Sequence, residues 1–192
     1  GLRVAVLAQP DWHDAEAFRA MGRPRLGVFI GAGNLDSMVA HYTAAKRRRS
    51  EDFYSPGKRT GCRPDRAAIV YCNRAREAFG PDMPIILGSL EASLRRFAHY
   101  DYWDDSVRRA ILFDAPADLL VYGMGEAATI EIAHRLKKKQ SVRTMTDIPG
   151  TGYITRDPAV CKFEHITLPS FEDVRDDKRL YAEATRTEYA EH

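Results

Sequence analysis

The sequence has little cysteine, no long apolar run and almost no net charge. Its 192 residues include three cysteines, an odd number without a close pair, which excludes a disulfide scaffold and favours a reducing compartment. No apolar run approaches the roughly 20 residues of a membrane-spanning helix, and the first residues do not resemble a signal peptide. The net charge of +2 does not point to nucleic acid as the main partner. We therefore expect a cytoplasmic domain that binds no membrane.

The usual signatures of metal binding, nucleophilic catalysis and phosphate binding are also missing. The histidines include no His-x-x-x-His pair, and Cys62, Cys72 and Cys161 form no Cys-x-x-Cys pair. Neither a Gly-x-Ser-x-Gly elbow nor a Walker A segment occurs. The glycines at 31 and 33 do not complete a dinucleotide fingerprint, because its third position holds Asp36. The sequence predicts no catalytic residue and no metal ligand.

Short apolar runs alternate with helical patterns through the first 149 residues. The apolar runs are Val4–Ala8, Leu26–Ile30, Pro84–Leu87 and Asp118–Tyr122. The helical patterns cover Asp14–Met21, Asp65–Phe79, with Asp65 as its cap and Gly80 as its stop, and Glu126–Lys139. Runs that are apolar throughout are typical of strands buried on both faces. Their alternation with helices predicts an α/β fold with a mainly parallel sheet.

The pattern changes after Gly150. Tyr153–Thr155 and Lys162–Leu168 have strand-type composition and predict a hairpin, whereas Phe171–His192 has the pattern of a charged helix. We predict an α/β domain at residues 1–149 and a connector of hairpin and helix at residues 150–192. The chain opens on a strand-type run and closes within a helical pattern, so we expect it to be a piece of a longer protein.

Three of the predicted strands lead into glycine-containing loops followed by helices. In open α/β sheets, ligands bind beyond the carboxyl ends of the strands, where helix N-termini offer free N–H groups. The candidate ligand-groove residues in these loops are Gly31, Gly33, Asn34, Gly88, Ser89, Glu91, Gly123, Gly125 and Glu126. The alternative is that the glycines only make tight turns, and that Glu91 and Glu126 only complement helix dipoles.

The densest group of polar and aromatic residues is His99-Tyr100-Asp101-Tyr102-Trp103. No periodic core pattern requires these residue types in succession, so we interpret the segment as the mouth of the same groove. His99 and Asp101 would orient a polar substrate, and Tyr102 and Trp103 would supply apolar walls. The competing interpretation is an aromatic segment that packs locally over the core.

The middle of the chain is basic. Residues 36–76 hold ten Lys and Arg against four Asp and Glu. Such a segment is either a solvated loop or a surface for phosphates or an acidic partner. Lys46-Arg47-Arg48-Arg49 lacks the interleaved aromatic residues of single-strand binders, so nucleic acid is the less favoured partner.

Several longer strings closely resemble the N-terminal region of one protein family. They are Leu7-Ala8-Gln9-Pro10-Asp11-Trp12, Ala32-Gly33-Asn34-Leu35-Asp36-Ser37-Met38-Val39, Arg63-Pro64-Asp65-Arg66-Ala67, Glu91-Ala92-Ser93-Leu94-Arg95-Arg96 with His99–Trp103, and Gly123-Met124-Gly125-Glu126. Over essentially the whole chain, the sequence is similar to the YgiQ family of uncharacterised radical SAM proteins. This resemblance implies a downstream barrel that holds a [4Fe–4S] cluster and S-adenosylmethionine. The cysteines of this chain do not have the C-x-x-x-C-x-x-C spacing, so we expect no cofactor here.

The same region resembles the cobalamin-binding domains of B12-dependent radical SAM enzymes, at Gly88–Ser93 and Gly123–Glu126. That resemblance implies a flavodoxin-like or Rossmann-like, doubly wound fold that lacks its first βα unit. The cobalt-ligand motif Asp-x-His-x-x-Gly is absent, so cobalamin is a minor alternative.

The resemblance implies an accessory, substrate-capping domain that is not catalytic by itself. Its partners would be the downstream barrel of the same polypeptide and a substrate that the sequence does not identify. The alternative, from another class, is an interaction module whose basic residues 46–66 bind nucleic acid or an acidic partner.

Overall fold

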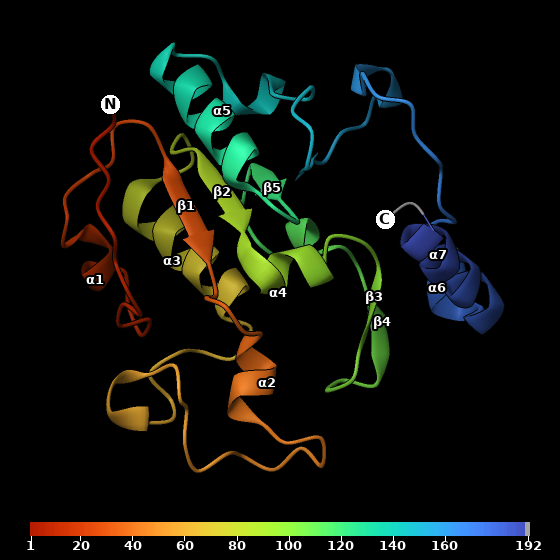
Figure 1. Cartoon of the computed structure of the whole chain (residues 1–192), viewed down its shortest axis with the longest axis horizontal. Coiled ribbons are helices and arrows are strands. Elements are labelled where there is room, and N and C mark those ends of the chain that lie inside the picture. Colours follow the sequence, from red (N-terminus) through yellow and green to blue (C-terminus); the bar gives the residue numbers. More distant parts are fainter. Residues whose placement is uncertain (191–192) are drawn as a thin grey trace.

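A computed structural model describes residues 1–190, and a four-stranded sheet lies at its centre (Figure 1). The strands, in their spatial order, are β1 (Val28–Gly31), β2 (Ile85–Gly88), β5 (Leu119–Val121) and β6 (Thr151–Gly152). The first three are parallel, whereas β6 runs antiparallel to β5. The predicted α/β fold with a mainly parallel sheet is therefore confirmed.

Helices cover both faces of this sheet. On one face, α3 (Ala67–Phe79) packs over Ile85 and Leu87 of β2, and α1 (Glu16–Arg19) packs on α3. On the other face, α5 (Glu126–Lys137) packs over Ile86. Successive side chains of a strand point to opposite faces, so β2 contributes to both cores and must be apolar at each of these positions.

Shorter elements gather where the parallel strands end. α2 (Ser37–His41) follows β1, and α4 (Ser89–Leu94) follows β2. A hairpin of β3 (His99–Asp101) and β4 (Ser106–Arg108), which the sequence did not predict, comes after α4. The 3-10 turns are Pro56–Lys58, Ile111–Phe113, Val142–Thr144 and Pro158–Val160. Helices α6 (Phe171–Asp176) and α7 (Lys178–Ala190) lie to one side of the sheet (Figure 1).

The predicted strand at Val4–Ala8 is wrong. The run has no strand structure, and the side chains of Val4 and Val6 are largely exposed. Within residues 1–190, β1 is an edge strand that pairs only with β2. A strand needs a neighbour for its backbone hydrogen bonds, and this run has none. The predicted helix Asp14–Met21 is also shorter than expected, because only α1 forms.

The predicted hairpin of Tyr153–Thr155 with Lys162–Leu168 is wrong as well. The short strand of this region, β6, ends at Gly152 and pairs with β5. Pro158 lies in a 3-10 turn, and the exposed side chains of Phe163 and Ile166 show that the second run meets no apolar face. The domain division at residue 150 stays a prediction, and β6, just beyond it, belongs to the main sheet.

The predicted C-terminal helix is divided in two at Asp177. This residue is extended, and its carboxylate accepts the backbone N–H of Arg179 at 2.7 Å. Aspartate side chains compete in this way with helical hydrogen bonds, so Asp177 ends α6 and starts α7. The predicted end of the helix at His192 lies outside the described residues.

The end of α3 agrees with the prediction, whereas the residue predicted to cap its start does not. Gly80, with φ of 84°, ends the helix as expected, because glycine adopts this left-handed conformation easily. Asp65 does not cap the helix. Its carboxylate accepts the Tyr42 hydroxyl at 2.7 Å and lies 2.6 Å from Nδ1 of His41, so it ties α2 to the start of α3.

Candidate functional site

The three glycine loops, at residues 31–34, 88–91 and 123–126, lie at the carboxyl ends of the parallel strands, which we call the carboxyl edge of the sheet. β1, β2 and β5 are parallel, and Gly31 is the register partner of Gly88 at their carboxyl ends. The direction of the β1 and β2 arrows in Figure 1 leads to α2 and α4 at this edge. The structure therefore brings the predicted loops side by side, and their role as a ligand groove stays a prediction.

Helix α4 lies across this edge and joins two of the loops. The hydroxyl oxygen of Ser89 accepts the backbone N–H of Ala32 at 3.1 Å. One turn later, the hydroxyl oxygen of Ser93 accepts the backbone N–H of Gly123 at 3.4 Å. Serines of α4 therefore bind one backbone amide in each of the loops after β1 and β5.

Local geometry explains several of the glycines. A Cβ at Gly31 would lie 3.0 Å from Cβ of Ser89, and one at Gly125 would lie 2.5 Å from Cγ1 of Val121. Gly33 and Gly123 have φ of 102° and 65°, which other residues adopt only with strain. Close packing explains Gly31 and Gly125, and backbone conformation explains Gly33 and Gly123, as the alternative of tight turns predicted.

Glu91 does not face a groove. Its side chain is 1% exposed, and its carboxylate accepts hydrogen bonds from the backbone N–H and hydroxyl of Ser37 and from the backbone N–H of Ala68. A carboxylate at two helix N-termini is favoured by the local dipoles. Glu91 thus joins α2, α3 and α4, and it would reach a ligand only if this network broke. Asn34, Ser89 and Glu126 are exposed at the edge.

The segment His99–Trp103 forms β3 and the start of the hairpin turn. Asp101 pairs with Arg66 at 2.8 Å. Burial alone would raise the pKa of Asp101, but the hydrogen bond and charge of Arg66, together with the backbone N–H groups of Trp103 and Asp104, outweigh burial and lower the pKa. Burial lowers the pKa of His99, whose Nδ1 lies 3.1 Å from the carbonyl oxygen of Phe97. Both side chains are half-buried.

The aromatic residues of this segment pack on the chain that follows α2. Trp103 lies 4.2 Å from Tyr42 between ring centroids, and Lys46 lies over the rings of Trp103 and Tyr102. Nζ of Lys46 also donates to the carbonyl oxygen of Trp103 at 2.9 Å. The hairpin therefore binds the loop after α2. This geometry favours local packing, and a role at the mouth of a groove stays a prediction.

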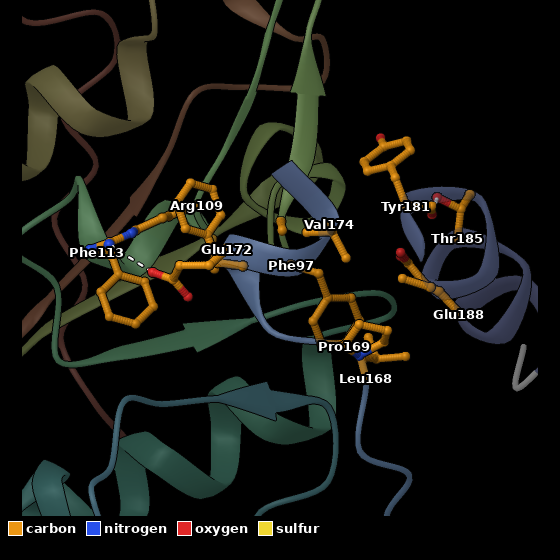
Figure 2. A pocket seen from close by; sticks show the side chains of 14 residues that line it. Phe97, Arg109, Phe113, Leu168, Pro169, Glu172, Val174, Tyr181, Thr185 and Glu188 are labelled. Atoms are coloured by element: carbon orange, nitrogen blue, oxygen red, sulfur yellow. Dashed lines mark hydrogen bonds and ion pairs between the residues drawn. The ribbon is translucent and has the colours of Figure 1, made fainter. Parts of the chain in front are cut away.

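Two cavities lie between residues 96–122 and the C-terminal segment of residues 164–188. The first is about 420 Å³ and is mainly apolar, with Phe97, Phe113, Leu168, Phe171 and Val174 in its wall (Figure 2). The second is about 620 Å³ and reaches Tyr122, the residue before Gly123. Within the described chain, no residue of the three glycine loops lines either cavity. Sequence reasoning missed them because their walls come from segments distant in sequence.

The polar groups around the first cavity already have partners. Arg109 donates to Glu172 at 3.3 Å, as the dashed line in Figure 2 shows. Its guanidinium also lies over the ring of Phe171. The hydroxyl of Tyr181 accepts the backbone N–H of Tyr100 at 3.0 Å. Because these charges and hydroxyls are satisfied, the cavity would accept an apolar group more readily than a charged one.

The basic segment is largely occupied by internal contacts. Arg63 and Asp52 form a buried ion pair at 2.8 Å, and Arg66 pairs with Asp101. Arg49 donates to the carbonyl oxygens of Val39 and Tyr42. With Lys46 bound to the hairpin, these contacts leave less of residues 46–66 for a nucleic acid than the sequence indicated.

The described residues do not fit an iron–sulfur cluster. Among residues 1–190, no group of three or more His, Cys, Asp or Glu side chains is arranged to hold a metal ion. Cys72 is buried, which raises the pKa of its thiol to about 12, and Cys62 and Cys161 are half-buried.

Within residues 1–190, no helix is long and apolar enough to cross a membrane.

Comparison with known families accounts for the whole chain. Residues 1–192 match the family described as Radical SAM N-terminal. The chain belongs to this family. A UPF0313 protein of Clostridium botulinum (strain 657 / Type Ba4) is 52% identical over 191 residues, and one of Clostridium perfringens (strain SM101 / Type A) is 51% identical.

These relatives are much longer than the chain. The alignments cover 100% of this chain but 30% of the first relative and 29% of the second. No solved structure was found to match. The predicted relationship to radical SAM proteins is therefore confirmed, and this Radical SAM N-terminal chain corresponds to about a third of each relative.

Proposed function

We propose that this chain is the accessory, substrate-capping domain of a radical SAM enzyme. The observation that carries the proposal is its membership of the Radical SAM N-terminal family, together with its 30% share of a longer relative. In this proposal, the chain shapes and covers the substrate space, and the radical chemistry belongs to the rest of the polypeptide.

The donor groups of the chain support this division of labour. Its three cysteines are free, and the described residues do not gather metal-binding side chains at one point. A [4Fe–4S] cluster with bound S-adenosylmethionine supplies radical chemistry by reductive cleavage of the sulfonium. We assign both groups to the remaining part of the polypeptide and expect no cobalamin in this chain.

The edge with the glycine loops is the surface that we assign to the substrate side. Asn34 and Glu126 are exposed there and offer an amide and a carboxylate. Behind them, the buried Glu91 joins α2, α3 and α4, and the buried Asp36 caps α2 by accepting the backbone N–H groups of Met38 and Val39. The edge therefore presents polar groups on a braced scaffold, which suits the positioning of a substrate.

The test compares the 192-residue chain with the full-length protein after anaerobic reconstitution with iron and sulfide. We expect stoichiometric iron and sulfide, and S-adenosylmethionine cleavage under reducing conditions, only in the full-length protein. Hydroxocobalamin should give no stoichiometric spectral shift with the chain. A stoichiometric cluster in the chain alone, or no cleavage by the reconstituted full-length protein, would contradict the proposal.

A further inference from the structure

The outer side of α4 is apolar although it faces water. Leu90 and Leu94, one helical turn apart, are 42% and 60% exposed. On the inner side of the same helix, Ala92 is fully buried and Glu91 is bound in its network. A surface helix normally turns polar residues outward, and a helix that is apolar on both sides is typical of one that is covered on both.

A third apolar side chain lies on the loop that α4 contacts. Met124, between Gly123 and Gly125, is 88% exposed. Ser93, the neighbour of Leu94, accepts the backbone N–H of Gly123, the neighbour of Met124. Leu94 and Met124 therefore adjoin a hydrogen-bonded pair of residues at the carboxyl edge of the sheet. We group Leu90, Leu94 and Met124 as the edge patch.

The core does not require the edge patch to be apolar. The inward contacts of α4 are made by Ala92, and its ends are held by the hydroxyls of Ser89 and Ser93. The fold would therefore tolerate polar residues at all three positions. Grouped apolar side chains that the fold does not use mark a surface for a partner, and exposed methionine is common on such surfaces because its side chain adapts its shape.

We propose that the edge patch is an intramolecular interface, which binds the radical SAM portion of the same polypeptide. This choice of occupant rests on the proposed function and on the length of the relatives, of which this chain covers about 30%. A covalently linked domain is present at high effective concentration, so a small apolar patch is sufficient to hold it. The edge of the sheet then faces the reaction space.

Methionine oxidation by hydrogen peroxide tests the interface directly, because its rate follows exposure of the sulfur. Met21, at the end of α1, is 62% exposed and serves as an internal reference. In the 192-residue chain, peptide mass spectrometry should find the two methionines oxidised at similar rates. In the full-length protein, Met124 should be oxidised on the order of tenfold more slowly than Met21. Equal rates in the full-length protein would overturn the proposal.

A pair of variants separates contact from folding. Leu90→Ser/Leu94→Ser should leave the thermal midpoint of the 192-residue chain unchanged, because both side chains are exposed in it. In the full-length protein, the same double variant should restore rapid oxidation of Met124. Ile130→Ser, an equally exposed apolar position on α5, is the matched control and should change neither measurement. Loss of protection with the control variant would contradict the assignment.

Two further outcomes distinguish the occupant and the proposed function. Protection of Met124 that appears in the 192-residue chain and rises with protein concentration would overturn the proposal in favour of a second copy. Protection in a full-length protein that cleaves no S-adenosylmethionine would support the interface and contradict the proposed function.

Discussion

The hydroxyl of Ser37 donates to Oε2 of Glu91 at 2.7 Å, and the same hydroxyl oxygen accepts the backbone N–H of Ala67 at 3.0 Å. One serine thus connects the glutamate of α4 to the first turn of α3. This network brings together the helices that follow β1 and β2, although their residues are more than 50 positions apart in sequence. The network lies beneath the glycine loops at the carboxyl edge of the sheet and holds these helices together.

We expect Glu91→Gln to destabilise the chain by about 2–3 kcal/mol, because a buried acceptor is replaced by an amide that must face an N–H donor. Glu77→Gln, at an exposed ion pair with Arg74, should cost less than about 1 kcal/mol. Urea unfolding followed by circular dichroism measures both. Equal losses of stability in the two variants would mean that the hydrogen-bond network of Glu91 adds little to the stability of the chain.

The buried pair of Asp52 and Arg63 should dominate the acid sensitivity of the loop after α2. Burial alone would raise the pKa of Asp52, but the hydrogen bonds from Ser55, Arg63 and the backbone N–H of Tyr54, with the charge of Arg63, together outweigh burial and lower the pKa. A carboxyl whose folded pKa lies below its unfolded value adds stability above the unfolded pKa, and this stability is lost as the pH falls toward the folded pKa. We therefore expect the free energy of unfolding to decrease when the pH is lowered below about 4.

Asp52→Asn should weaken this dependence and cost about 3–5 kcal/mol at neutral pH, because it leaves the Arg63 charge buried without its counter-ion. Asp82→Asn, at an exposed position, should leave the profile unchanged. Chemical unfolding at a series of pH values is the measurement. A profile of Asp52→Asn that is parallel to that of the unsubstituted chain would contradict the argument.

Gly125 should be intolerant of any side chain. Gly125→Ala places a Cβ within 2.5 Å of Cγ1 of Val121, and we expect a cost of about 1–3 kcal/mol from this overlap. Gly88→Ala, whose Cβ would meet its nearest atom at 3.5 Å, is the matched control. Adding Val121→Ala should recover part of the loss caused by Gly125→Ala. Without such recovery, the contact with Val121 is not the cause.

The basic segment should not bind nucleic acid measurably. Because Lys46, Arg63 and Arg66 are engaged internally, we expect no change in fluorescence anisotropy of labelled single-stranded or double-stranded oligonucleotides at low salt. Affinity that falls steeply with added salt, and that is lost in Arg47→Ala/Arg48→Ala, would instead favour the interaction module.

The core strands were predictable because burial on both faces leaves a local signature. Leu26–Ile30 and Pro84–Leu87 each overlap a strand that ends one residue later, and Asp118–Tyr122 contains β5; their glycine loops lie at the predicted edge. The strand-type run at Val4–Ala8 shows the limit of this reasoning. Composition indicates that a segment is compatible with a strand, but a strand forms only when a neighbouring strand pairs with its backbone.

The candidate site was predictable in its place but not in its details. The rule for parallel sheets located the edge, whereas the orientation of each side chain depended on packing. Glu91 and Glu126 occupy similar positions after strands in the sequence, yet Glu91 is buried by α2 and α3 and Glu126 is exposed. The two serines of α4 that bind the loops had no recognisable motif.

Local apolar patterns and long shared strings were enough to predict the family, the mainly parallel α/β architecture and the edge at which the loops meet. Which polar side chains are available at that edge depended on how distant segments pack together. Asp101 forms an ion pair with Arg66, and Glu91 accepts hydrogen bonds from Ser37 and Ala68. The backbone amides of Ala32 and Gly123 donate to serine hydroxyls of α4. The reason is that buried polar groups must find partners, and the nearest partners in space come from segments that are far apart along the chain.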